Sequence, residues 1–174
     1  MITIIIGTNS VNSVTAAVAD IYAAYLTELG EEFQLLDMRE MPTGIIAPDM
    51  YVNPKPEFLA FQERYLFPAE KFIIIIPEYN AGIPGIFKLM MDASDIKQAW
   101  YGKKATITGV ASGRAGNLRG LDSLTNILNY LKVNVHYNKL PISRVRGLIN
   151  EERELIDEKT ISSIKEQIGQ FLAF

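Results

Sequence analysis

The sequence contains no cysteine, one histidine and one tryptophan. The absence of cysteine excludes disulfide bonds, zinc–thiolate sites and thiol nucleophiles. No apolar run approaches the roughly 20 residues of a membrane-spanning helix. The apolar stretch Ile2–Ile6 is short and lacks the basic flank of a secretory leader. With 17 Lys and Arg against 20 Asp and Glu, the net charge of −3 provides no basic field for nucleic acid or membranes. We therefore expect a soluble, cytoplasmic protein.

The side chains that catalyse reactions in most enzymes are also scarce. We find no Ser–His–Asp set, no metal-ligand cluster and no close pair of carboxylates with a clear role. His136 falls in or beside an expected strand, and we interpret it as a structural residue. The sequence therefore predicts no metal site and no catalytic residue supplied by the chain itself.

The 174 residues fit a single domain spanning 1–174, without internal repeats. Apolar runs predict strands at Ile2–Ile6, Phe33–Asp37, Lys71–Ile76, Ala105–Val110 and Val133–Tyr137. Apolar residues three or four apart predict helices over 14–29, 57–67, a segment after Pro84, 118–131 and 161–171. The alternation predicts an α/β, flavodoxin-like three-layer sandwich, with a five-stranded parallel sheet in the order 2-1-3-4-5 and helices on both faces. Ligands of such sheets bind beyond the carboxyl ends of the strands.

Three loops follow strands that meet at this edge. The first loop, Gly7–Ser13, precedes a helix and offers hydroxyl and amide groups from Thr8, Asn9, Ser10, Asn12 and Ser13. A helix N-terminus with such donors suits a phosphate, although no Lys or Arg occurs before Arg39. The alternative is an ordinary helix cap made by Ser13 or Asn12.

The second loop, Pro77–Gly85, presents Tyr79 and Asn80 on a backbone that two prolines stiffen, and its glycines let a flat ring approach closely. The alternative is a stiff surface turn. The third loop, Ala111–Asn117, contains Gly113 and Gly116 just before another helix, whose N–H groups could face a developing negative charge. The alternative here is a left-handed turn that requires glycine. The long connections Glu40–Pro56 and Asn138–Asp157 are also candidates for function or for an interface.

Together the three loops resemble the NAD(P)H-dependent FMN reductase family, which includes FMN-dependent azo and quinone reductases. The resemblance covers roughly Ile2 to Leu131. Its strongest element is Pro77-Glu78-Tyr79-Asn80, followed by Ile83-Pro84-Gly85, Lys88 and Asp92. This is similar to the family signature P-E-Y-N-x-x-x-P-G-x-L-K-N-A-x-D, with Phe87, Leu89 and Met90 replacing Leu, Asn and Ala. Ser112, Gly113 and Gly116 match the family's second flavin-contacting loop.

The resemblance implies an oxidoreductase that binds FMN at the strand ends. It implies contacts to the ring from Pro77, Glu78, Tyr79, Asn80, Ser112, Gly113 and Gly116, and to the phosphate from Thr8, Ser10, Asn12 and Ser13. NADPH or NADH would pass hydride to FMN, and FMN would pass it to a small acceptor: a flavin, a quinone or an azo compound. The resemblance further implies a homodimer or homotetramer, formed partly through helix 85–95.

One position departs from the family pattern. The family's first loop usually reads G-S-x-R-x-x-S, and its arginine pairs with the phosphate, whereas position 10 here is serine. This uncharged loop is similar to that of flavodoxins, which leaves two alternatives: an electron carrier, or a non-catalytic relative with weakened FMN binding. Arg114 and Arg119 are candidates for the phosphates of NAD(P)H, or are solvent-exposed residues at a helix start.

Overall fold

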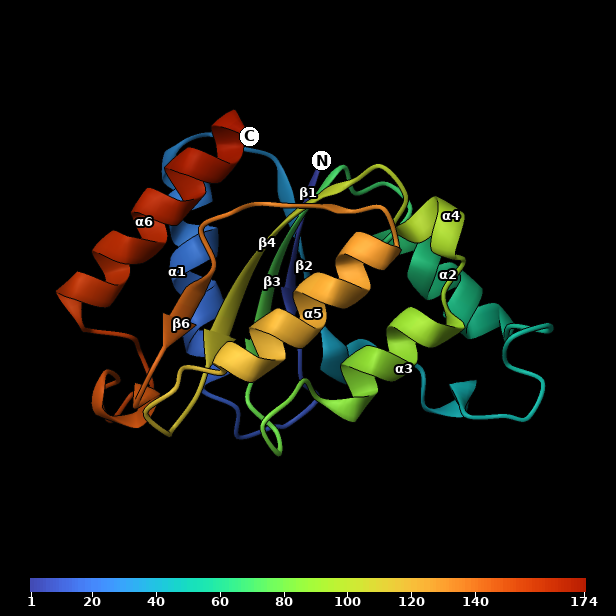
Figure 1. Ribbon diagram of the computed structural model, residues 1–174, viewed down its shortest axis with the longest axis horizontal. Coiled ribbons are helices and arrows are strands. Elements are labelled where there is room, and N and C mark those ends of the chain that lie inside the picture. The colour runs from blue at the N-terminus through green and yellow to red at the C-terminus, as the bar shows by residue number, and fades with distance from the viewer.

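A parallel sheet forms the centre of the protein in the computed structural model, which describes residues 1–174 (Figure 1). Its main strands are β1 (Ile2–Ile6), β2 (Phe33–Asp37), β3 (Lys71–Pro77) and β4 (Lys104–Val110). The strand order is β2-β1-β3-β4-β5, where β5 is the short strand Asn134–Val135, and every pair is parallel. The predicted order is therefore confirmed, and the carboxyl ends of β1, β3 and β4 lie side by side.

Helices cover both faces of the sheet (Figure 1). One face carries α1 (Thr15–Glu28) and α6 (Glu158–Ala173), and the other carries α2 (Pro56–Tyr65), α3 (Gly85–Ala93), α4 (Ile96–Ala99) and α5 (Leu118–Tyr130). Each face has its own apolar core. None of the helices is long and apolar enough to cross a bilayer.

The isoleucine run of β3 shows why its sequence is apolar without alternation. Ile73 and Ile75 pack into the core beneath α1 and α6, whereas Ile74 and Ile76 pack into the core on the opposite face. All four side chains are fully buried. Both faces of this part of the strand are covered, so none of these four positions is open to solvent.

The fifth strand differs from the prediction. A continuous strand over Val133–Tyr137 is wrong: β5 contains only Asn134–Val135, and β6 (Leu140–Ile142) pairs with the far end of β4. The N–H of His136 still donates to the carbonyl of Ala105 in β4 at 2.8 Å, and residues 137–139 then leave the sheet. The side chain of His136 is 1% exposed and packs against the rings of Tyr137, Phe171 and Phe174. This placement agrees with a structural role for the histidine.

A side-chain amide replaces the missing strand pairing. Gln167 of α6 is fully buried, and its Nε2 donates to the carbonyl of Ile107 at 3.3 Å and to that of Asn138 at 2.8 Å. Its Oε1 accepts from the hydroxyls of Tyr22 and Thr108. The glutamine thus joins β4, α1 and the interrupted strand.

The two long connections are partly ordered into turns. Residues 38–56 contain the 3₁₀ turns η1 (Met38–Glu40) and η2 (Thr43–Ile45). Residues 138–157 contain β6 and a further turn, η3 (Val145–Gly147). Both connections approach the carboxyl edge of the sheet, where they contribute walls to the cavities described below.

Candidate functional site

A cleft of about 310 Å³ lies at the carboxyl edge of the sheet, where the three predicted loops meet. We call it the strand-end cleft. Its volume falls at the lower end of the range of small-molecule sites, roughly 300–1,000 Å³. It is lined by Ser10, Asn12, Ser13, Val14, Thr15, Pro77, Glu78, Tyr79, Val110, Ala111, Ser112, Val145 and Arg146.

The first loop is fixed against the end of β3. The N–H of Gly7 donates to the carbonyl of Ile75 at 2.8 Å, and a Cβ on Gly7 would lie 2.9 Å from that oxygen, so only glycine fits. Thr8 is 1% exposed and does not line the cleft. Its hydroxyl accepts from the N–H of Ser10 at 3.2 Å and lies 2.8 Å from the hydroxyl of Tyr79. Thr8 therefore connects the first loop to the second.

The first turn of α1 keeps unused hydrogen-bond donors. Ser13 Oγ accepts from the N–H of Thr15 at 3.0 Å, whereas the N–H groups of Ala16 and Ala17 have no partner inside or outside the helix. The hydroxyl of Thr15 is fully buried and also has no partner, and the residue is among those that line the cleft. Buried polar groups nearly always have hydrogen-bond partners. These donors fit a phosphate, and the ordinary cap by Ser13 or Asn12 does not account for them.

The second loop turns tightly at Asn80 and Ala81, whose φ angles are 52° and 60°. Tyr79 and Gly82 exchange backbone hydrogen bonds across this turn at 3.1 and 3.0 Å. The turn carries Asn80 away from the residues that line the cleft, while Pro77, Glu78 and Tyr79 remain among them. Tyr79 is 41% exposed, so a ligand can contact its ring.

The third loop contributes Ser112 to the cleft, whereas its two glycines do not line the cleft. Gly116 has a φ of +57°, as in a left-handed turn, and a Cβ there would lie 2.7 Å from Pro141 Cβ. The carbonyl of Gly113 accepts from the N–H of Arg144 at 2.9 Å. The amide of Asn117, at the start of α5, donates to the carbonyl of Ile76 at 3.2 Å and ties this loop to β3.

The structure thus brings together most of the predicted site residues and adds two polar ones, Thr15 and Arg146. Ser10, Asn12, Ser13, Pro77, Glu78, Tyr79 and Ser112 line the cleft, whereas Thr8, Asn80, Gly113 and Gly116 lie in the same loops but do not line it. Sequence reasoning missed Thr15, because it lies inside the helix, and Arg146, because it follows the part of the fifth strand that was not predicted. Arg114 and Arg119 are exposed and do not line the cleft.

A second cavity of about 460 Å³, the side groove, lies beside the first loop. It is lined by Asn9, Val11, Met38, Arg39, Met41, Pro42, Thr43, Ile45, Ile46, Ile86 and Leu89. Arg39 pairs with Asp37 at the end of β2. Burial raises the pKa of Asp37, but the hydrogen bonds and charge of Arg39 outweigh burial and lower that pKa overall. Most of the residues that line the groove are apolar, and its one cationic side chain is paired with a carboxylate.

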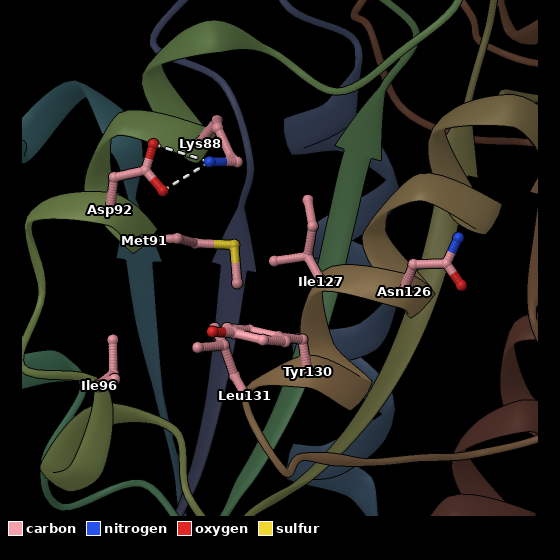
Figure 2. A pocket seen from close by; sticks show the side chains of 8 residues that line it. All are labelled: Lys88, Met91, Asp92, Ile96, Asn126, Ile127, Tyr130 and Leu131. Atoms are coloured by element: carbon pink, nitrogen blue, oxygen red, sulfur yellow. Dashed lines mark hydrogen bonds and ion pairs between the residues drawn. The ribbon is translucent and has the colours of Figure 1, made fainter.

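A third cavity of about 430 Å³, the helix groove, lies between α3 and α5 on the outside of the protein (Figure 2). Lys88 donates to both carboxylate oxygens of Asp92, at 2.5 and 2.7 Å, along one side. Tyr130 lies on the other side and is 84% exposed. Phe87, Met90 and Met91, three of the apolar residues of α3, are buried in the core of the chain itself.

A flavodoxin-like sheet with a phosphate-compatible cleft at its switch point defines a protein of the nucleotide-cofactor-binding α/β class. Residues 1–145 match the family of NADPH-dependent FMN reductases, and the chain belongs to that family. It is an oxidoreductase with FMN as cofactor and NAD(P)H as reductant. The match ends at the first residue of η3, so the later residues lie outside it.

Several characterised proteins are similar to this chain. A protein of Vibrio ruber, the NADH:(hydroxy)cinnamate reductase subunit CrdA, is 25% identical over 98% of this chain and 84% of its own length. A 2-hydroxy-1,4-benzoquinone reductase of a Burkholderia species is 23% identical over 82% of this chain and 78% of its own length. The structure of FerB, a flavoenzyme NAD(P)H:(acceptor) oxidoreductase from Paracoccus denitrificans, superposes with a TM-score of 0.82 at 20% identity, covering 99% of this chain and 94% of FerB. That structure supports the fold.

Proposed function

We propose that the strand-end cleft is the FMN site of this reductase, within one domain that spans residues 1–174. The phosphate would be held by Ser10, Asn12, Ser13 and Thr15 with the free N–H groups of α1. The observation that carries this assignment is the buried, unpartnered hydroxyl of Thr15 beside unpaired backbone donors. A helix N-terminus also favours negative charge electrostatically.

The remaining cleft residues would flank the ring system. FMN, when bound, supplies the hydride-accepting ring that no side chain of the protein can replace. Pro77, Glu78 and Tyr79 would lie on one side and Ser112 on the other. The contact between Tyr79 and Thr8 would hold the second loop in register with the first, so that ring and phosphate are positioned together. The N-terminus of α5, behind the third loop, would favour negative charge on the ligand.

We assign the side groove to the electron acceptor. Its walls are mostly apolar and include the guanidinium of Arg39, which is paired with Asp37, and this combination suits a small aromatic acceptor such as a quinone. The relatives named above are reductases of a hydroxybenzoquinone and of a (hydroxy)cinnamate, which are aromatic acceptors, and this supports the assignment. A flavin and an azo compound share the same planar, apolar character and are included in the assay below.

The test begins with flavin binding. We expect the purified protein to quench the fluorescence of added FMN with micromolar or tighter affinity, and the bound flavin to be bleached anaerobically by NADH or NADPH without a partner protein. Turnover is then followed with a quinone, an azo dye and free FMN. Failure to bind FMN overturns the proposal. FMN that is bound but not reduced by either nicotinamide supports the alternative of an electron carrier.

We also propose that the protein is a homodimer that pairs through the helix groove and the α3 helix. Phe87, Met90 and Met91 of α3 are buried within the chain, whereas the helix groove beside them leaves Ile96 and Tyr130 exposed and Ile127 half-buried, an apolar surface that a second copy would cover. Light scattering of the wild type is expected to give twice the mass of the chain, and Tyr130→Asp is expected to give monomers. A monomeric wild type contradicts the proposal.

We also propose a cytoplasmic location, where reduced nicotinamides are available.

A further inference from the structure

The strand-end cleft contains two charged side chains, Glu78 and Arg146. Arg146 lies on η3, directly after β6, and therefore comes from the segment that interrupts and continues the fifth strand. It is exposed and forms none of the ion pairs in the structure. An unpaired guanidinium at the wall of a cleft that also contains unpaired N–H groups makes one side of that cleft electropositive.

The backbone of Arg146 is held in place by the third loop. The N–H of Val145 donates to the carbonyl of Ala111 at 3.0 Å, and the N–H of Arg144 donates to that of Gly113 at 2.9 Å. The side chain of Val145 is 1% exposed and belongs to the core shared with α1. The position of the arginine is therefore set by β4 and α1, the elements that also set the position of the first and third loops.

A second arginine fastens the same segment to the first loop. Arg153 donates from its NH2 group to the carbonyl of Asn12 at 2.6 Å. This hydrogen bond joins residues that are 141 positions apart in the sequence. Because Arg153 already has a partner and does not line the cleft, we interpret it as a tether that keeps η3 beside the loop.

We propose that Arg146 is the cationic partner of the FMN phosphate, in place of the arginine that the family carries at position 10. The inference rests on the proposed FMN site. Ser10 and Arg146 both line the strand-end cleft, so Arg146 can supply from η3 the positive charge that position 10 does not supply from the first loop. A guanidinium binds phosphate through two parallel N–H donors. Glu78 comes from the second loop, which flanks the ring in the proposed site.

The test compares two ligands that differ only in the phosphate. Equilibrium dissociation constants for FMN and riboflavin are measured by fluorescence quenching for the wild type, Arg146→Gln and Arg144→Gln. Loss of a charge-assisted hydrogen bond is expected to weaken FMN binding by about tenfold to a hundredfold in Arg146→Gln, with riboflavin binding unchanged. Arg144→Gln removes the same charge two residues away, at a position that does not line the cleft, and is expected to bind both ligands like the wild type.

A rescue variant separates the role of the charge from a role in folding. Adding Ser10→Arg to Arg146→Gln restores the family's cation and is expected to recover most of the FMN affinity. Equal losses for FMN and riboflavin, or FMN affinity unchanged in Arg146→Gln, overturn the assignment of Arg146 while leaving the FMN site intact. A wild type that binds riboflavin and FMN equally well also overturns it, whereas a wild type that binds neither overturns the proposed function.

Discussion

Replacing Thr15 with valine is expected to change the stability and the FMN affinity of the protein in opposite directions. Valine keeps the shape of threonine and removes only the hydroxyl, which in this structure is fully buried and unpartnered. A buried polar group without a partner costs about 1–3 kcal/mol. Removing it should raise the free energy of unfolding of the flavin-free protein by about 1–2 kcal/mol. At roughly 2–4 °C per kcal/mol for a chain of this size, the melting temperature should rise by several degrees.

The same change removes a donor to the proposed phosphate. A hydrogen bond to a charged group is worth about 1.5–3 kcal/mol, so FMN should bind about tenfold to a hundredfold more weakly. Thr106→Val is the matched control, because the hydroxyl of Thr106 is also buried and unpartnered but does not line the strand-end cleft. It should be stabilised to a similar degree and bind FMN like the wild type. The assays are thermal unfolding without ligand and quenching of FMN fluorescence. Unchanged FMN affinity in Thr15→Val, or equal weakening in the control, would refute the reasoning.

Three further predictions concern the framework. Gln167→Leu removes the donor to the carbonyls of Ile107 and Asn138 and should lower the free energy of unfolding in urea by about 2–3 kcal/mol, with Ser162→Ala on the exposed face of α6 as a neutral control. A loss below about 0.5 kcal/mol contradicts the role given to this amide. Gly109→Ala places a Cβ 2.3 Å from the carbonyl oxygen of Gly116, so it should lower the free energy of unfolding by about 1–3 kcal/mol and weaken FMN binding by displacing the third loop. Gly147→Ala is the control, because a Cβ there meets no atom within 4 Å and should change neither the stability nor the FMN affinity. Burial lowers the pKa of Lys103 from 10.5 to about 8, so between these pH values the unfolded chain binds more protons than the folded protein. The free energy of unfolding should therefore rise with pH across that window. The rise should be absent in Lys103→Met, and an equal rise in that variant would show that other groups cause it.

Much of the framework could be predicted because it depends on local patterns. The isoleucines of β3 specify a strand covered on both faces, and the motif from Pro77 to Asn80 identifies the edge where the cleft forms. The short extent of the fifth strand and the separate β6 could not be predicted, because they go with tertiary contacts such as those of His136 with Phe171 and Phe174, which lie more than thirty positions away in the sequence. Residue type alone suggested phosphate contacts from Thr8, whereas its burial and its contact with Tyr79 are tertiary properties.

The interruption in the fifth strand affects whether other chains can pair with the edge of the sheet. Where β5 stops and β6 has not begun, β4 would otherwise present bare backbone at the margin of the sheet, a place where an extended segment of another molecule can attach. The amide of Gln167 occupies the carbonyl of Ile107 there, and the ring of His136 packs against those of Phe171 and Phe174 beside it. The C-terminal helix α6 therefore blocks edge-to-edge pairing with other chains, in addition to packing in the core.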